Sequence, residues 1–497
     1  MPRLFIFAIG GTGARVLRSL TMLLAAGVRL ENCDTVVPVL IDPDSDNGDL
    51  KRTKALLEQY ALLHRTLYPD GTRPASGFFS QPLSTLAALH TTGAEAELRD
   101  TFVYDFGGIT KSFGKYLEMP DLLQRAPETY ELLNLLFTPE SLNASLDVGF
   151  RGSPNVGSVV LNPLVQSKEM RYLAQSLQAG DRAFFISSIF GGTGAAGFPL
   201  LVKNLRDTST ASALQKPDLR RQLKAGALVV LPYFTLQNAE TPEQIDSNTF
   251  VTKTKTALSY YAENLTGVDA LYYLGDKPGQ PLPNHAGRSE QRNAANLIEL
   301  LGALAVPHFT RQPDAQLSAD APTYHEFGLK NDVPDVDFGQ WPAELRADVA
   351  QPMIRFHWFA RYLQHDAKDD LQAPWASLIN LRGNPEKNGN LYKELNGFFN
   401  AYSEWLKELS MTERRFSAFR PEELDHNRMV SDKLLDPGTW DRIMRNDLSK
   451  KRIASELDQA IPPTAPANPT EADSLRWIVA AFEKATAELM KTKLKYT

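Results

Sequence analysis

Short runs of consecutive apolar residues alternate with longer stretches of helical spacing along the first 309 residues of the chain. The apolar runs cover residues 4–9, 36–41, 184–189, 225–231 and 268–274. Runs of this length, bounded by glycine, proline or polar residues, predict buried strands. Helical spacing covers residues 14–26, 51–68, 120–137, 198–205, 248–264 and 293–308. The alternation predicts an α/β fold with a doubly wound parallel sheet.

The pattern changes after residue 309. The following residues are polar and include Pro313, Pro322 and Pro334, which predicts a loop or linker. Helical spacing then returns at residues 345–365, 390–409 and 474–493. The expected organisation is an α/β domain over residues 1–309, a linker over 310–342 and a mostly α-helical C-terminal domain over 343–497.

Two of the predicted strands are followed by the same tetrapeptide, Gly-Gly-Thr-Gly, and then by a helix. A glycine loop in this position lets backbone N–H groups and a helix N-terminus point at an anion, because glycine has no Cβ to block the approach. Two such loops in one chain indicate a polyphosphate held between them. The candidate binding residues are Gly10, Gly11, Thr12 and Gly13 in the first loop and Gly191, Gly192, Thr193 and Gly194 in the second. The two threonines have an alternative role as helix caps.

Further candidate residues lie between the two glycine loops in the sequence. Asp42 and Asp44 follow the second predicted strand, at the strand end where open α/β sheets bind ligands. They are candidates for a Mg²⁺ or ribose contact, or for capping a turn. A third loop of small residues contains Gly152 and Ser153 as candidate binding residues, and Arg151 as a candidate for a terminal phosphate or for the surface.

Composition narrows the possible functions. The chain has 497 residues with 53 basic and 59 acidic side chains, so its net charge of −6 gives no basic excess for nucleic-acid binding. Cys33 is the only cysteine, which excludes an intramolecular disulfide and a cysteine-rich zinc site. The eight histidines show no metal-ligand spacing. No segment reaches about 18 uninterrupted apolar residues, so no transmembrane segment is expected, and the expected compartment is the cytoplasm.

The order of these segments resembles the tubulin/FtsZ superfamily. The family signature Gly-Gly-Gly-Thr-Gly-Ser/Thr-Gly is similar to residues 190–197, which read Phe-Gly-Gly-Thr-Gly-Ala-Ala-Gly. The first glycine loop, the acidic loop and the loop of small residues resemble the family's other phosphate-side loops in the same order. Asn296, or alternatively Asn293, resembles the residue that reads guanine at the start of the family's central helix. Bacterial tubulin-like proteins are more similar to the chain than FtsZ itself.

This resemblance covers about residues 1–309. It implies that this part is a tubulin-like GTP-binding domain with GTP or GDP and Mg²⁺ as cofactors. It also implies self-assembly into a homo-oligomer or filament.

Hydrolysis of GTP has less support in the sequence than binding. Ala195 replaces the signature hydroxyl residue, and residues 310–314 do not match the family's acidic loop. Asp314 and the acidic cluster at residues 332–337 are therefore poor candidates for activating water, and no residue is assigned as catalytic. Glu299 is interpreted as a buried hydrogen-bond partner.

Three functions stay open. The first is a guanine-nucleotide-binding protein that self-assembles, with or without GTP hydrolysis. The second is a non-hydrolysing, nucleotide-bound scaffold whose helical C-terminal region binds a protein partner. The third is an NAD-dependent oxidoreductase, because Gly11, Gly13 and Asp42 partly imitate the dinucleotide fingerprint. Val16 stands where the third fingerprint glycine is expected, and the second glycine loop would then have no role.

Overall fold

The computed structural model gives the fold of most of the chain. It describes residues 2–71, 74, 76–89, 98–106, 109–150, 152–209, 214–238, 247–279, 281–285, 287–326, 333–342, 345–367, 389–424, 426, 428–430, 450–460 and 469–493. No helix among these residues is long and apolar enough to cross a lipid bilayer.

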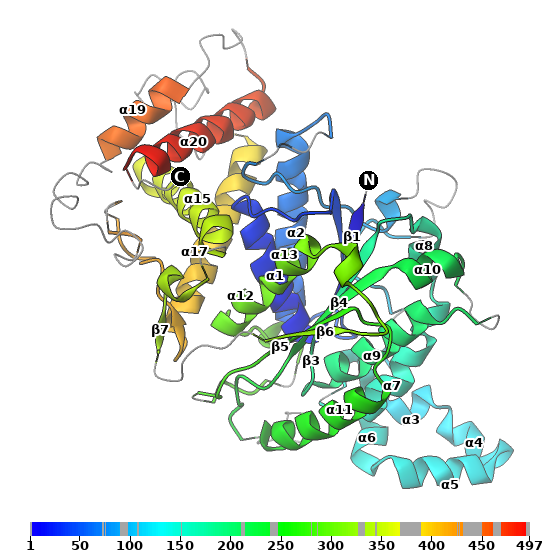
Figure 1. Cartoon of the computed structure of the whole chain (residues 1–497). Coiled ribbons are helices and arrows are strands. Elements are labelled where there is room, and N and C mark those ends of the chain that lie inside the picture. The colour runs from blue at the N-terminus through cyan, green and yellow to red at the C-terminus, as the bar shows by residue number, and fades with distance from the viewer. Residues whose placement is uncertain are drawn as a thin grey trace.

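A six-stranded parallel sheet forms the centre of the molecule, which confirms the expected parallel α/β sheet (Figure 1). Its strands stand in the order β2-β1-β3-β4-β5-β6. Every residue of β1 and β3 is buried, as expected for strands covered on both faces. The strands are β1 (Arg3–Ile9), β2 (Thr35–Ile41), β3 (Arg182–Ser188), β4 (Lys224–Val230), β5 (Ala270–Leu274) and β6 (Thr323–Glu326).

The strand order reverses between β1 and β3. The chain runs from β1 to β2 on one side and then returns to β3 on the other side of β1. In open parallel sheets, the connections after two such strands leave in opposite directions and open a crevice at the strands' carboxyl ends. The two glycine loops follow these two strands, so the topology brings them to one crevice.

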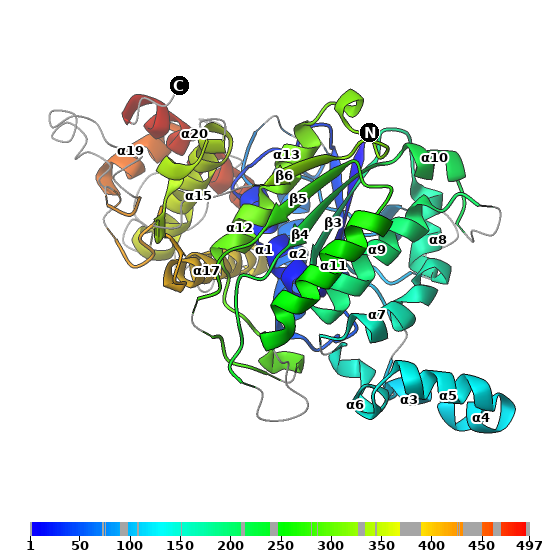
Figure 2. The same cartoon turned by 60° about the horizontal axis from the view of Figure 1, so that its bottom comes forward.

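Helices cover both faces of the sheet (Figure 2). On one face, α1 (Gly10–Ala25) packs against α2 (Gly48–Leu67) and α12 (Leu297–Ala303). On the other face, α9 (Gly192–Arg206) packs against α7 (Pro154–Leu161). The other helices beside this face are α8 (Lys168–Ser176), α10 (Pro217–Gln222) and α11 (Phe250–Asn264).

Pro38 lies inside β2, where it removes one backbone hydrogen-bond donor. The N–H groups of Val36 and Leu40 donate to the carbonyl oxygens of Pro82 and Phe102, at 3.0 and 2.7 Å, along the outer edge of β2. Backbone N–H groups alternate in direction along a strand, so the position of Pro38 also faces this edge. The proline therefore costs no hydrogen bond to β1, because β2 is the edge strand of the sheet.

The expected linker contributes to the sheet. Residues 310–342 include β6, which pairs in parallel with β5 from Ala270↔Thr323 to Tyr273↔Glu326. They also include η6 (Asp314–Gln316), η7 (Phe338–Gln340) and β7 (Asp335–Val336), which pairs with β8 (Arg415–Phe416). The expectation of a plain linker is therefore wrong at β6, whose alternating half-buried residues form no apolar run.

The central helix also differs from its expected bounds. Asn296 is the N-cap of α12, so residues 293–295 precede the helix. The helical path ends at Leu304 and resumes as α13 (Ala305–Arg311). The helix begins at Leu297 and not at Asn293, because the side-chain oxygen of Asn296 accepts a hydrogen bond from the backbone N–H of Ile298, at 2.9 Å, and so caps the helix.

The C-terminal helices pack on the α1 and α2 side of the sheet (Figure 1). Trp405 is fully buried, and its indole N–H donates to the hydroxyl oxygen of Ser19 in α1 at 3.1 Å. One continuous hydrophobic core joins these helices to the sheet half. They are η8 (Arg346–Ala350), α15 (Gln351–Arg361), η9 (Tyr362–Asp366), α17 (Asn390–Met411), α19 (Lys450–Ala460) and α20 (Glu471–Lys493).

A group of short helices projects from the sheet half (Figure 2). The segment expected as one helix at residues 120–137 is two helices separated by Ala126. Leu135 is 85% exposed there. The helices of this arm are α3 (Phe113–Tyr116), α4 (Met119–Arg125), α5 (Pro127–Leu136) and α6 (Pro139–Asn143). The 3₁₀ helices in the first 309 residues that the structure describes are η1 (Ala87–Leu89), η2 (Leu146–Val148), η3 (Asn162–Gln166), η4 (Ser247–Thr249) and η5 (Arg288–Glu290).

Candidate functional site

A cavity lies where the carboxyl ends of β1, β2 and β3 meet the glycine loops. The cavity has a volume of about 120 Å³. Ten of the candidate residues line it: Gly10, Gly11, Thr12, Asp42, Asp44, Gly152, Gly191, Gly192, Thr193 and Gly194. The other three, Gly13, Ser153 and Asn296, are not among the lining residues.

The first glycine loop turns sharply from β1 into α1. Gly10 has a φ of +73°, a conformation that residues with a side chain rarely adopt. Gly13 faces the sheet instead of the cavity, and a Cβ atom there would lie 2.8 Å from the carbonyl carbon of Ala8 and the carbonyl oxygen of Ile186. Gly13 therefore allows α1 to pack closely on the strands, which brings the start of α1 to the cavity.

The second glycine loop touches the first. A Cβ atom on Gly10 would lie 3.5 Å from the backbone nitrogen of Gly194 and from the Cβ of Thr193. Gly194 packs on the end of β3, where an added Cβ would lie 2.7 Å from the carbonyl oxygen of Ser188. The loops after β1 and β3 thus form one continuous surface.

The third loop closes the cavity beside the second. Gly149 and Gly152 have φ values of +75° and +69°. A Cβ on Gly192 would lie 3.1 Å from the backbone nitrogens of Gly152 and Ser153. Ser153 is the N-cap residue of α7. Arg151 lies outside the described residues.

The N-termini of α1 and α9 therefore meet at one cavity, and Gly152, directly before the N-cap residue of α7, lines it as well. Within the described part of the chain, no side chain caps any of these three helices. The N-cap residues of α1 and α9 are Ile9 and Gly191, so the alternative that Thr12 and Thr193 act as helix caps is not observed. The first N–H groups of a helix have no intrahelical partner, and they carry the positive end of the helix dipole. This arrangement suits an anion with several oxygen atoms.

Two carboxylates stand at the same cavity. Asp42 and Asp44 form successive turns: Asp42 Oδ1 accepts the N–H of Asp44 at 3.0 Å, and Asp44 Oδ1 accepts the N–H of Asp46 at 3.1 Å. Asp44 Oδ2 accepts the N–H of Arg288 at 2.6 Å. The turn-capping role is thus observed. A Cβ on Gly149 would lie 3.9 Å from both Asp42 Oδ1 and Thr193 Oγ1, so Asp42 faces the second glycine loop.

Burial raises the pKa of Asp42 to about 7. The hydrogen bond from the N–H of Asp44 lowers this pKa, and the neighbouring carboxylates of Asp44 and Asp49 raise it further. Burial also raises the pKa of Asp44. Among the described residues, Asp42 has no ion pair with a basic side chain. A cation bound beside such a buried carboxylate would stabilise the ionised form of the carboxylate.

Arg15 is a lining residue that the sequence analysis missed. Its guanidinium is 4% exposed and forms ion pairs with Glu299 at 2.5 Å and Asp49 at 2.7 Å. It also donates to the hydroxyl of Tyr233 at 2.8 Å. Burial alone would lower the pKa of Arg15, but these partners, Glu299 first, raise it well above its usual value. The signal in the sequence is an arginine inside a helix that is otherwise buried and mostly apolar.

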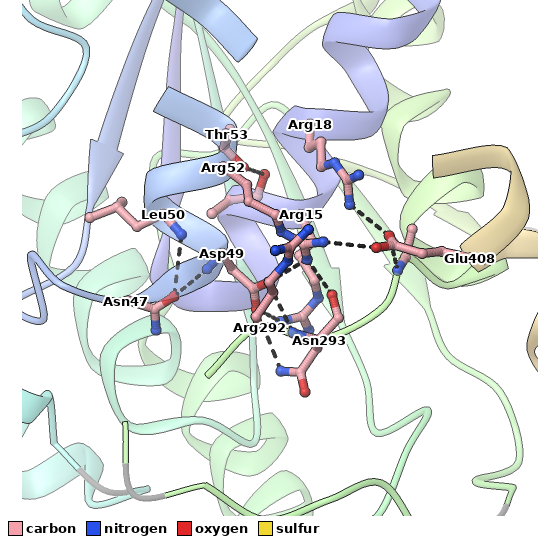
Figure 3. A network of polar contacts seen from close by, with 12 residues as sticks. Arg15, Arg18, Asn47, Asp49, Leu50, Arg52, Thr53, Arg292, Asn293 and Glu408 are labelled. Carbon is pink, nitrogen blue, oxygen red and sulfur yellow. Dashed lines mark hydrogen bonds and ion pairs between the residues drawn. The ribbon is translucent and has the colours of Figure 1, made fainter. Parts of the chain in front are cut away.

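The two candidate asparagines have different positions. Asn296 forms a capping box with Glu299, whose carboxylate accepts the N–H of Asn296 at 2.9 Å. Asn293 instead lines the cavity. Figure 3 shows its side chain beside Asp49. Its side-chain N–H group lies 3.5 Å from Asp49 Oδ2, and its backbone N–H donates to Asp49 Oδ1 at 3.1 Å. The structure gives Asn293 Oδ1 no hydrogen bond to the residues it describes.

One wall of the cavity is aromatic. Phe190 occupies the first signature position, and its ring lies 4.8 Å from that of Phe250 and 5.5 Å from that of Phe234. The ring of Phe190 thus adds to the apolar wall of the cavity. The wall suits a flat, partly apolar group beside the phosphate-binding loops.

The acidic residues considered for water activation are bound elsewhere. Asp314 pairs with Arg182 at 2.7 Å, at the start of β3 and so at the sheet end opposite the cavity. Asp335 pairs with Arg415, and Asp337 accepts the N–H of Gly339 at 2.8 Å. Asp332 lies outside the described residues. The described part of the chain also has no group of three histidine, cysteine or carboxylate side chains placed to hold a metal by themselves.

Comparison with known proteins gives similarities to solved structures and none in sequence. No family model matches the chain, and no curated protein matches it in sequence. A solved structure that is similar in part is the GTPγS-bound protofilament of CetZ2 from Haloferax volcanii. The two chains are 13% identical with a TM-score of 0.27, and the match covers 62% of this chain and 58% of CetZ2.

Proposed function

We propose that this chain binds a guanine nucleotide, with the phosphates between the two Gly-Gly-Thr-Gly loops, as a tubulin/FtsZ-like protein. The observation that carries the proposal is that the N-termini of α1 and α9, together with the loop before α7, meet at one cavity where the strand order reverses. A single glycine loop is commonly a turn, but two loops in contact and a third beside them offer backbone donors on several sides.

The charges of the cavity favour a phosphate group accompanied by a divalent cation. Arg15 is already neutralised by two carboxylates, so it supplies little charge to a phosphate. Asp42 and Asp44 would repel phosphate oxygens unless a cation stood between them. Mg²⁺ is commonly held by one or two carboxylates together with phosphates, and the buried Asp42 fits this role. When bound, Mg²⁺ would neutralise phosphate oxygens.

Recognition of the base rests on Asn293 in this proposal. Guanine presents N–H donors on its pairing edge, and Asn293 Oδ1 is an acceptor at the cavity lining. Asn296 caps α12 and would hold the segment that carries Asn293. The tubulin/FtsZ resemblance supports guanine over adenine, and Phe234 and Phe250 offer an apolar wall.

A nucleotide-bound scaffold without turnover is the second candidate. The ion pair of Asp314 with Arg182 and the capping role of Asp337 favour it over a GTPase, since both carboxylates already have structural partners. In either case we propose self-assembly into a homo-oligomer or filament, on the basis of the family resemblance. An oxidoreductase has less support, because the fully buried Val16 occupies the place of the third fingerprint glycine.

The test is to identify the nucleotide released when the purified protein is denatured. We expect GDP or GTP, and we expect its loss in Gly192→Asp and Thr193→Val. Thr256→Val is the matched control, because Thr256 is exposed on α11 away from the cavity lining. Release of no guanine nucleotide, with no binding when GTP and Mg²⁺ are added back, would falsify the proposal.

The two candidates differ in turnover. Phosphate release from GTP with Mg²⁺ that disappears in Thr193→Val would establish a GTPase. Bound nucleotide that stays intact over many hours would establish the scaffold. Sedimentation with GTP, GDP or no nucleotide measures self-assembly in the same samples.

A further inference from the structure

Glu408 of the C-terminal helix α17 reaches into the half of the molecule that carries the cavity (Figure 3). Its Oε2 accepts from Arg18 of α1 and from the backbone N–H of Ala295, at 2.7 and 2.8 Å. Its Oε1 accepts from Arg52 of α2 at 2.8 Å. One side chain thus joins α17, α1, α2 and the segment before α12.

The contacts of Glu408 continue to the cavity. Arg52 also donates to Asp49 Oδ1 at 2.9 Å and to the backbone oxygen of Asn293. Asp49 in turn holds the backbone N–H and the side chain of Asn293. Asn293, a lining residue, is therefore held from both sides of its backbone, by Asp49 and Arg52, and Ala295 two residues later is held by Glu408 itself.

The charges of this network balance only when Glu408 is present. Three arginines, Arg15, Arg18 and Arg52, face three carboxylates of Asp49, Glu299 and Glu408. The side chain of Arg18 is 3% exposed, so its charge needs a partner within the protein. The carboxylate of Glu404 lies 3.8 Å from the guanidinium of Arg18. The side chain of Glu404 is 45% exposed, however, and also forms an ion pair with Arg292. Glu408 is therefore the close partner of Arg18.

We infer that Glu408 is a positioning residue for base recognition: it holds the segment from Asn293 to Ala295 so that the Asn293 amide faces the base. This inference rests on the proposed nucleotide binding and adds the C-terminal region to that site. Among the described residues Glu408 has no hydrogen bond to the glycine loops; its network meets the first loop at Arg15, which donates to the hydroxyl of Thr12 at 3.4 Å, a longer contact than those that Glu408 makes itself. The effect of Glu408 should therefore fall on the base and not on the phosphates.

The experiment compares Glu408→Gln with Glu404→Gln, one helical turn earlier on α17. Binding of GTP, ATP and inorganic tripolyphosphate, each with Mg²⁺, is measured by calorimetry. For Glu408→Gln we expect about a tenfold loss of GTP affinity, a smaller preference for GTP over ATP, and unchanged tripolyphosphate affinity. For Glu404→Gln we expect wild-type values for all three ligands.

A second measurement uses the wild-type protein and does not depend on the folding of a variant. Amide hydrogen exchange should slow at residues 291–296 and in α17 when GTP is added. Tripolyphosphate should slow exchange only at the glycine loops. An equal loss of GTP and tripolyphosphate affinity in Glu408→Gln, an unchanged GTP to ATP ratio, or an α17 unaffected by GTP would overturn the inference. A wild-type protein that binds neither nucleotide overturns the proposed function, and the inference with it.

Discussion

Replacing Asp42 by asparagine removes one buried negative charge from the cavity with little change in size. The amide oxygen of asparagine can still accept the N–H of Asp44, so the turn after β2 is kept. The substitution removes the free-energy cost of burying an ionised carboxylate beside Asp44 and Asp49. Among the described residues, this carboxylate has no basic partner. The substitution therefore separates the charge of Asp42 from its role in the turn.

The pKa of Asp42 gives the size and the pH range of the effect. Burial raises this pKa from an ordinary 3.8 to about 7, so the folded protein keeps the proton after the unfolded chain has released it. The free energy of unfolding accordingly falls as the pH rises from about 4 to about 7, and the loss is complete above pH 7. A difference of about three pKa units corresponds to a loss on the order of 4 kcal/mol at pH 8.

The assay is urea unfolding of wild type and Asp42→Asn without nucleotide or Mg²⁺, at pH 5 and pH 8. We expect Asp42→Asn to be more stable than wild type by a few kcal/mol at pH 8 and by much less at pH 5. The pKa of Glu483 is also raised to about 7, but both proteins keep this group, so it cancels in the comparison. Asp46→Asn is the control, because Asp46 is exposed and paired with Lys51.

Added Mg²⁺ should stabilise wild type at pH 8 and leave Asp42→Asn unchanged. Equal stability of the two proteins at pH 8 would show that Asp42 is not an ionised, unpaired group. An equal response to Mg²⁺ would show that the ion does not use Asp42. Either result refutes the reasoning about the acidic loop.

Three other substitutions test separate parts of the structure. Gly194→Ala places a Cβ 2.7 Å from the carbonyl oxygen of Ser188, so we expect a loss of about 1–3 kcal/mol in urea unfolding and weaker tripolyphosphate binding. Wild-type stability and binding would contradict the close packing of the second glycine loop on the end of β3. Arg15→Met leaves the buried Glu299 without its cation, while Asp49 keeps Arg52, and should cost about 3–5 kcal/mol in the same assay; a neutral result would mean that Glu299 is not ionised. Leu135→Glu, at a side chain that is 85% exposed, should change stability by less than about 0.5 kcal/mol, and a larger loss would place α5 against the rest of the protein.

The strands of the parallel sheet could be predicted from local pattern. Buried parallel strands are continuous apolar runs, and β1 to β5 begin and end within two residues of the predicted runs. β6 could not be found in this way, because an edge strand with one exposed face has no such run, and Tyr324 in it is 66% exposed. Pro38 would be out of place in a central strand, but it is tolerated in β2 because β2 is the other edge of the sheet.

Some residues of the candidate site could be predicted from a local sequence motif, and others could not. The glycine loops are local motifs, so their place beside strand ends follows from the sequence. The partners of Arg15 are distant, since Glu299 lies 284 positions away, and no local pattern indicates that they meet. The sequence leaves the choice between Asn296 and Asn293 open for a related reason: it shows two asparagines near a helix start, but only the backbone shows that Asn296 caps α12 and that Asn293 lines the cavity.

The helical character of the C-terminal part was predictable, but its docking was not. The contacts of Glu408 and Trp405 with α1 and α2 depend on residues more than 350 positions apart in the sequence. Through these contacts α17 supports the segment that carries Asn293. The expected linker at residues 310–342 therefore does not divide the chain into a part that forms the cavity and a part that is independent of it.

This arrangement has a thermodynamic consequence for any ligand that contacts Asn293. If docked α17 strengthens GTP binding about tenfold through Glu408, bound GTP must strengthen the docking of α17 by the same factor, because the coupling between two equilibria is reciprocal. The phosphates alone would produce a smaller effect, since the glycine loops pack on β1, β3 and each other, and the first loop meets this network at Arg15 and Asp49 and not at Glu408. A base-specific signal would therefore reach the C-terminal helices, while the effect of occupying the phosphate region would be more local. The docking of α17 would then report which nucleotide is bound and not only that the cavity is filled.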